Sequence, residues 1–179
     1  LLTNNGSNHS PALLPDGDGG VWVAWKGTGF YILRLQHLDA SGSELLTAGG
    51  VQIYNAFGTP GWPLLFPDGA GGVLAVLSVQ DNVDFSVAVQ RVDADGNPLW
   101  GTDGAGFTAG YNNCDEKMRV VQGDSASLVM LRGDVEHRMQ RIDTAGNWRW
   151  GASGVSVGAA DGCYVRRRLC SDGAGGSYT

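Results

Sequence analysis

The sequence Pro-Asp-Gly-Ala-Gly-Gly at residues 67–72 is one copy of a phrase that recurs along the chain. Residues 15–20 read Pro-Asp-Gly-Asp-Gly-Gly, and residues 171–176 read Ser-Asp-Gly-Ala-Gly-Gly. A degenerate copy that lacks the glycine pair, Gln-Gly-Asp-Ser-Ala-Ser, lies at residues 122–127. Glycine-rich phrases that recur in this way are typical of tight turns in a repeat protein, so we expect an array of one structural unit.

A second phrase, Asp-x-x-Gly, recurs with nearly the same spacing as the first. Its aspartates are Asp39, Asp93 and Asp143, so the phrase recurs after 54 and then 50 residues. Aspartate can accept hydrogen bonds from the backbone of such a turn, and glycine can adopt positive φ there. The two phrases together indicate a supersecondary unit of about 50 residues.

The glycine phrases at residues 15–20 and 67–72, and the degenerate copy at 122–127, each lead into a short run that is apolar at every position, at residues 21–25, 73–77 and 128–131. These runs are too short for helices and rich in strand-forming residues. A glutamine-centred strand, a strand after the Asp-x-x-Gly turn and a strand before the next glycine phrase complete the unit. We therefore predict an all-β fold, a β-propeller of four-stranded antiparallel blades that is incomplete in this chain. The apolar runs are expected to be the innermost strands, buried on both faces.

The predicted blade boundaries follow the glycine phrases. Residues 1–15 end one blade, residues 16–67, 68–122 and 123–171 each form a blade, and residues 172–179 begin the next. Because propellers usually have 4 to 8 blades, we expect this chain to be part of a longer one. The alternative architecture is an open stack of four-stranded units, which would leave apolar faces uncovered at both ends.

The stretch that follows the glutamine strand resembles a known repeat. Residues 91–101, Arg-Val-Asp-Ala-Asp-Gly-Asn-Pro-Leu-Trp-Gly, and a weaker copy at 141–151 resemble the Asp…Gly-x-x-Leu-Trp signature of quinoprotein-like β-propeller repeats. They are also similar to repeats of large secreted bacterial propeller proteins. In that family the repeated tryptophan packs between neighbouring blades, so the resemblance implies this role for Trp100 and Trp150, with Leu46 at the equivalent position. The adjacent-cysteine disulfide of the quinoprotein enzymes is missing, and no cofactor is expected.

Composition excludes some partner classes. The chain has a formal net charge of −6 and 42% apolar residues, which is typical of a globular protein without a concentrated basic face. We therefore expect no nucleic-acid partner. No apolar stretch approaches the roughly 18 residues that would suggest a membrane span.

Neither the acidic turns nor the histidines form a convincing metal site. The Asp-x-Asp-Gly stretches at residues 16–19 and 93–96 resemble the start of a calcium loop, but the later bidentate acid is missing, so turn chemistry is favoured. The three histidines, among them His37, lie at unrelated points of the repeat. His37 stands where the other repeats have Arg91 and Arg141, which suggests ordinary exposed strand positions.

The cysteines suggest an oxidising compartment. Cys114 follows Gly104 by ten residues and Cys163 follows Gly154 by nine, so the two cysteines occupy nearly the same place in consecutive blades. We predict a disulfide between them and a buried, free Cys170. Such a bond implies a secreted, periplasmic or cell-surface protein, in keeping with the bacterial repeats that the chain resembles.

Strand alternation sorts the connections onto two faces. In an antiparallel blade the two repeated phrases emerge on one face, and the connections that differ between repeats emerge on the other. Variable, aromatic loops on a rigid scaffold are where binding normally resides. The expected partner-binding residues of the variable face are Phe57, Trp62, Tyr111, Tyr164, Asp84, Asp115 and Glu116.

These features favour a non-catalytic secreted or envelope propeller that acts as a protein-interaction or assembly scaffold. Its partner would be a protein or a carbohydrate, bound through the variable face. The alternative is the propeller portion of an extracellular enzyme, such as a polysaccharide-acting hydrolase or lyase or a quinoprotein. No catalytic or metal-binding residue is assigned by the sequence.

Overall fold

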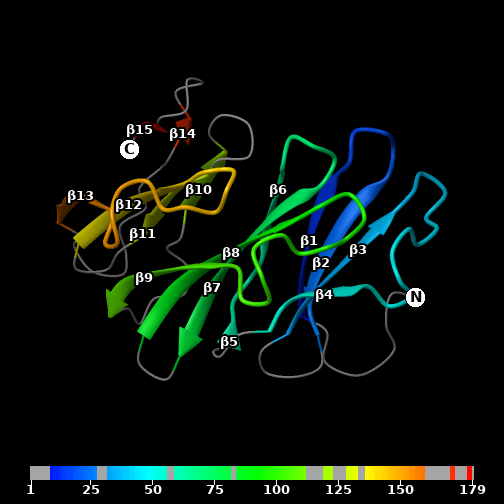
Figure 1. The fold of residues 1–179 in the computed structure, drawn as a ribbon, viewed down its shortest axis with the longest axis horizontal. Coiled ribbons are helices and arrows are strands. Elements are labelled where there is room, and N and C mark those ends of the chain that lie inside the picture. Colours follow the sequence, from blue (N-terminus) through cyan, green and yellow to red (C-terminus); the bar gives the residue numbers. More distant parts are fainter. Residues whose placement is uncertain are drawn as a thin grey trace.

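A computed structural model describes most of the chain, and every element it describes is a β-strand (Figure 1). The described residues are 9–27, 32–55, 59–81, 84–111, 119–122, 128–132, 136–159, 170–171 and 177–178. The all-β prediction is confirmed for these residues. None of them belongs to a helix that is long and apolar enough to cross a membrane.

The strands form three antiparallel sheets of four or five strands, followed by a short pair. The first sheet has the order β1 (His9–Pro15), β2 (Val21–Lys26), β3 (Leu33–Leu38) and β4 (Val51–Tyr54). In the second, β5 (Thr59–Pro60) and β6 (Leu64–Pro67) both pair with β7 (Val73–Asp81), and then come β8 (Asp84–Val92) and β9 (Ala105–Tyr111). The third has the order β10 (Arg119–Gln122), β11 (Leu128–Arg132), β12 (Glu136–Ile142) and β13 (Val155–Ala159). The last pair is β14 (Cys170–Ser171) with β15 (Ser177–Tyr178).

The first two glycine phrases join strands within a sheet. Pro15 pairs with Val21 across the first phrase, and Pro67 pairs with Val73 across the second. The Asp16 N–H donates to the Gly20 carbonyl at 3.2 Å, which closes the first turn. A turn this short can connect only adjacent antiparallel strands, whereas the passage between sheets takes the longer connection after β4.

The apolar runs are therefore second strands, and the prediction that they are innermost is wrong. The run in β7 is buried on both faces because the first and third sheets cover it, not because it lies at one edge. The sheets span residues 9–54, 59–111 and 119–159. Each sheet begins before the blade boundary predicted for it: β1 precedes residue 16, β5 and β6 precede residue 68, and β10 precedes residue 123.

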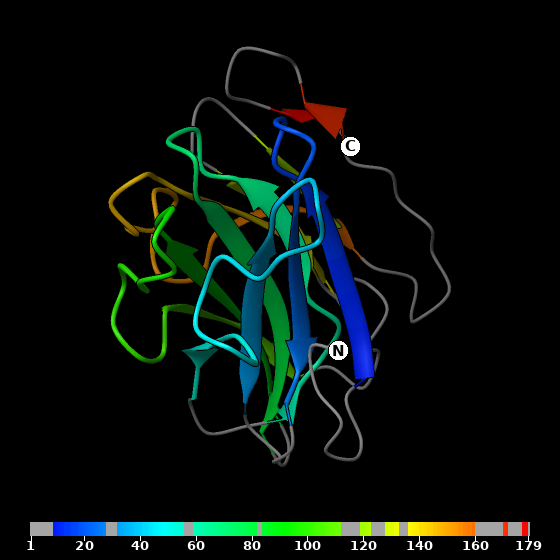
Figure 2. The same cartoon turned by 90° about the vertical axis from the view of Figure 1, so that its right-hand side faces the viewer.

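The three sheets stack face to face, with the second between the other two. Trp22 and Leu35 of the first sheet share a core cluster with Leu77 of the second. On the opposite face of the second sheet, Val76 clusters with Ile142 of the third. In Figure 2 the first sheet stands in front, with the second and third behind it. This stacking explains why β7 is apolar and buried at each position from 73 to 77.

The first strands of successive sheets lie beside one another. β1 contacts β6, and β10 contacts β14. The Gln122 side-chain amide of β10 donates to the Pro67 carbonyl of β6 at 2.6 Å. The sheets thus come together along their first strands (Figure 1).

A large apolar side chain at the same position of the repeat joins one sheet to the next at two places. Leu46 lies on Gly96, where an added Cβ would be 2.9 Å from a Leu46 methyl group. Trp100 lies in the same way on Gly146, with ring atoms 3.0 Å from the Cβ position. Glycine is required at both turns because the bulky residue of the preceding sheet occupies the space of a side chain. Trp150 is half-buried within a smaller cluster of the third sheet.

A buried glutamine holds the connection between the third and fourth strands of each sheet. Gln36, Gln90 and Gln140 are all fully buried. The Gln90 Oε1 accepts from the Trp100 N–H at 3.1 Å, and its Nε2 donates to the Gly101 carbonyl at 2.7 Å. Gln36 and Gln140 bond the residues ten and eleven positions later in the same way. The glutamine of the strand is therefore a structural residue.

Replacing this glutamine should weaken the whole molecule. We expect Gln90→Met to lower the free energy of unfolding by about 2 to 4 kcal/mol, because it leaves the Trp100 N–H and the carbonyls of Gly101 and Ile53 without their partner. Urea denaturation followed by circular dichroism measures the change. The control is Gln52→Met at an exposed strand position, expected to change stability by less than about 0.5 kcal/mol. Equal urea midpoints for the two variants would contradict the role assigned to Gln90.

Candidate partner-binding face

The ends of the described strands lie on two faces, as strand alternation predicts. The turns at residues 16–20, 39–42, 68–72, 93–96 and 143–146 form what we call the turn face. Neighbouring turns touch, since an added Cβ on the glycine at 19 would lie 3.3 Å from the Ala40 Cβ. The repeated turns share one face even though the sheets begin earlier than the predicted blades. Their place depends only on the alternating direction of the strands. We call the opposite ends of the strands the loop face.

Polar groups of the turn face bind their own backbone. The Asp93 Oδ1 accepts from the N–H groups of Asp95 at 3.0 Å and Asn97 at 2.8 Å. Asp143 accepts from the equivalent amides of its turn. Hydrogen bonds from Asn97 hold the pKa of Asp93 below its usual value. The prediction of turn chemistry for these aspartates is confirmed.

The first aspartate of each of the first two glycine phrases reaches the strand after the apolar run. The Asp16 Oδ2 lies 2.9 Å from the His37 Nε2, and the Asp68 Oδ2 accepts from the Arg91 Nε at 3.0 Å. The side chain of Asp68 is almost fully buried. His37 and Arg91 therefore tie the turn to the sheet, and the interpretation of these positions as ordinary exposed ones is wrong.

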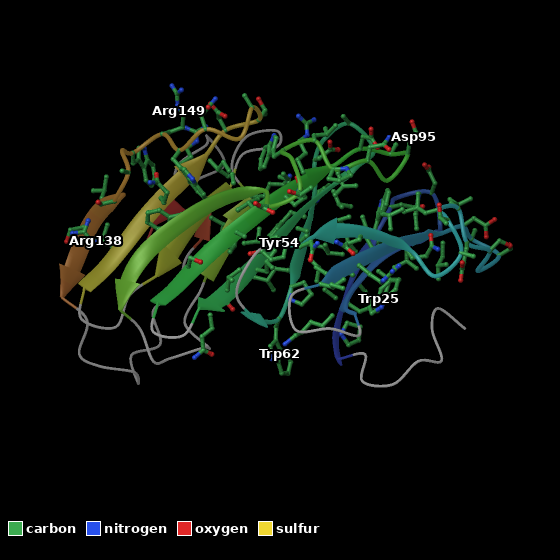
Figure 3. All side chains as sticks on the ribbon, turned by 60° about the horizontal axis from the view of Figure 1, so that its bottom comes forward. Trp25, Tyr54, Trp62, Asp95, Arg138 and Arg149 are labelled. Carbon is green, nitrogen blue, oxygen red and sulfur yellow. The ribbon has the colours of Figure 1, made fainter. Side chains whose placement is uncertain are left out.

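Trp62 is the aromatic side chain that the described loop face presents to solvent. Its exposed fraction is 77%, and it follows Gly61 in the connection between β5 and β6. Figure 3 shows it on the opposite side of the molecule from Asp95 and Arg149. The tryptophan is thus far from the turns that close the sheets.

The backbone around Trp62 is firmly held. The Gly61 N–H donates to the Ser78 carbonyl at 2.6 Å, and the Ser78 hydroxyl occupies the place where a Cβ on Gly61 would lie. Pro63 on the other side is buried. An exposed indole on a fixed backbone loses little conformational entropy when it meets a partner. Sequence reasoning missed the roles of Gly61 and Ser78, although the Gly-Trp-Pro triplet was a signal for a constrained tryptophan.

Other sequence-predicted residues are placed only in part. Tyr111 ends β9 and Asp84 begins β8, so the strands carry both to the loop-face ends of the second sheet. The remaining members of the predicted site and both cysteines of the predicted disulfide lie outside the described residues: Phe57, Asp115, Glu116, Tyr164, Cys114 and Cys163. Their grouping around Trp62 stays a prediction.

Tyr54, an aromatic residue of the same connecting region, is a core residue. It ends β4 and is only 3% exposed. Burial, with a smaller contribution from the charge of Asp103, raises the pKa of Tyr54 to about 12. It packs between the first and second sheets and is not available to a partner.

Comparison with known proteins adds no assignment. No protein-family model matches the chain, and no curated protein matches it. Among the residues that the structure describes, no three His, Cys, Asp or Glu side chains are grouped so as to hold a metal ion.

The two tryptophans at 62 and 100 should differ in their effect on folding. We expect Trp62→Ala to change the free energy of unfolding by less than about 0.5 kcal/mol, since its side chain is exposed. Trp100→Ala should cost about 2 kcal/mol, because it opens the joint with Gly146. Urea denaturation of both variants measures the difference. A large loss with Trp62→Ala would show that the indole is part of the core.

The turn aspartates should make stability depend on pH in the acid range. The folded-state pKa of Asp93 is lowered, so its contribution to stability is present above its ordinary pKa of about 3.8 and is lost as the pH falls through the lower folded-state value. We expect the urea midpoint of the wild type to fall between about pH 5 and pH 2, and that of Asp93→Asn to fall less. Asp95→Asn is the matched control, because Asp95 enters the turn through its backbone N–H. Identical profiles for Asp93→Asn and the wild type would contradict this role.

Proposed function

We propose that this chain is part of a β-propeller that acts as a non-catalytic interaction scaffold, with the loop face as its partner-binding surface. The proposal includes a secreted or envelope location, as the expected Cys114–Cys163 disulfide implies. Its partner is a protein or a carbohydrate with an apolar surface that can cover an indole. The observation that carries the proposal is the exposed Trp62 on a constrained backbone.

The repeated joint between sheets supports the propeller. Leu46 on Gly96 and Trp100 on Gly146 set successive sheets against each other in the same way. Identical steps between units generate a regular array, and the convergence of β1, β6, β10 and β14 at one side is what units around a common axis require. A propeller closes such an array and covers the outer sheet faces.

The contrast between the two faces supports the choice of surface. On the turn face, Asp16, Asp68, Asp93 and Asp143 are committed to turn amides and cross-strand partners. The Trp62 side chain is not committed to the packing of the protein in this way, since 77% of its surface is exposed. Aromatic side chains with large apolar area dominate the energy of many interfaces, so burying this indole against a partner is favourable.

Site-specific photocrosslinking tests the proposal. A photoreactive phenylalanine analogue is placed at position 62 and, in a separate variant, at position 95 on the turn face. Both proteins are irradiated in cells that produce them, and in a parallel sample after mixing with soluble polysaccharides. We expect defined adducts from position 62 and none from position 95, because the partner covers the loop face.

Two further variants separate contact from positioning. Excess Trp62→Ala protein should compete poorly for the partner and leave the amount of the position-62 adduct almost unchanged. Excess Asp95→Ala protein should reduce the adduct as much as excess wild type does. Gly61→Ala keeps the indole but displaces its backbone from Ser78, so it should also compete poorly while remaining folded by circular dichroism. Adducts from position 95 alone, or the absence of any adduct from position 62, would overturn the assignment of the loop face.

A further inference from the structure

A histidine, an aspartate and a tryptophan meet at the first glycine turn. The His37 Nε2 lies 2.9 Å from the Asp16 Oδ2, and both side chains are about one-seventh exposed, at 15% and 13%. The His37 ring stacks on Trp22 with the ring centroids 4.0 Å apart and an angle of 10° between the planes. Trp22 itself is a fully buried member of the core between the first and second sheets.

Asp16 connects this cluster to the turn. Its other oxygen, Oδ1, accepts from the N–H groups of Asp18 and Gly20, each at 2.8 Å. The turn has no spare room at Gly20, where the Leu38 carbonyl and the Asp16 carboxylate crowd the Cβ position. The orientation of one carboxylate thus depends on both the turn amides and His37.

In the second sheet, the equivalent pair is Asp68 with Arg91, whose guanidinium group carries a permanent charge. Asp68 holds the equivalent amides of Ala70 and Gly72, each at 2.8 Å, and its Oδ2 bonds to Arg91. Arginine stays protonated at all ordinary pH values, whereas histidine changes its charge between about pH 5 and 8. The two turns therefore share one geometry and differ in whether the partner of the aspartate can lose its charge.

Two carboxylates that follow His37 in the chain have partners of their own. Asp39, two residues along the chain, accepts from the Ser41 and Ser43 amides. Glu44, on the connection after β3, bonds to the Gln36 side chain and to a backbone amide. The turn contributes Asp16 and the exposed Asp18, of which Asp16 bonds to the ring, and β2 contributes the neutral Trp22 ring. Asp16 is accordingly the carboxylate whose bond responds to the charge of His37.

We propose that His37, Asp16 and Trp22 form a pH-sensitive latch that holds the turn at residues 16–20 closed when the histidine is protonated and loosens it when the histidine is neutral. The protonated ring donates a charge-assisted hydrogen bond to the carboxylate and lies as a cation on the face of the indole. The neutral ring retains only a weaker hydrogen bond. This inference is independent of the proposed partner-binding face, since it concerns the opposite side of the molecule.

Amide hydrogen exchange on the full chain tests the latch. Protection factors, corrected for the intrinsic effect of pH on exchange, are measured by NMR for the Gly20 and Gly72 amides at pH 5.5 and pH 7.5. We expect the protection of Gly20 to fall about fivefold at the higher pH, since a charge-assisted bond is replaced by a neutral one. The protection of Gly72 should stay constant, which provides a control within the same molecule.

Two substitutions separate charge from structure. His37→Arg copies the pair of the second sheet and should keep the Gly20 amide protected at both pH values. His37→Gln retains a neutral hydrogen-bonding side chain and should show the lower protection at both. Protection of Gly20 that does not change with pH in the wild type would overturn the latch. So would an equal change at Gly72, or a pH dependence that persists in His37→Arg.

Discussion

The buried glutamine of the third strand is the interaction on which the rest of each sheet depends. Its amide has one acceptor and one donor group, and these bind the N–H and the carbonyl of consecutive residues on the returning connection. That connection carries the Asp-x-x-Gly turn and the bulky residue that covers the next sheet. Gln90 also donates to the Ile53 carbonyl of the first sheet at 3.2 Å. A buried amide that lacked these partners would be costly, so the position tolerates little else.

The joints between sheets follow from that constraint. Because the glutamine fixes the connection, Leu46 and Trp100 take equivalent positions in their sheets. Each lies on the turn glycine of the next sheet. The contact requires a residue without a side chain on one sheet and a large apolar residue on the other. Two features that look unrelated in the sequence, a turn glycine and a tryptophan four residues later, are halves of contacts made with different neighbours.

The two faces of the molecule have different physical roles. On the turn face, aspartates bind backbone amides within a few residues, and His37 or Arg91 ties them to the sheet. The polar groups there are largely satisfied internally. At the loop face, Gly61, Ser78 and Pro63 hold a backbone from which Trp62 points outward. Among the described residues, the polar groups of the turn face are thus bound within the protein, while Trp62 on the other side stays open to solvent.

The sequence by itself determined the strand character, the turn chemistry and the sorting of connections onto two faces. These depend on local bonding within four or five residues and on the alternation of strands, so they can be recognised without knowing any neighbour. Only the tertiary structure decided which strands share a sheet. An apolar run is the expected sequence both for the innermost strand of a blade and for a second strand between stacked sheets, so the run cannot distinguish the two positions. It also decided that Tyr54 is buried and Trp62 exposed, and that His37 meets Asp16 from 21 residues away. Those outcomes depend on the packing of one sheet against another, and no local pattern contains that information.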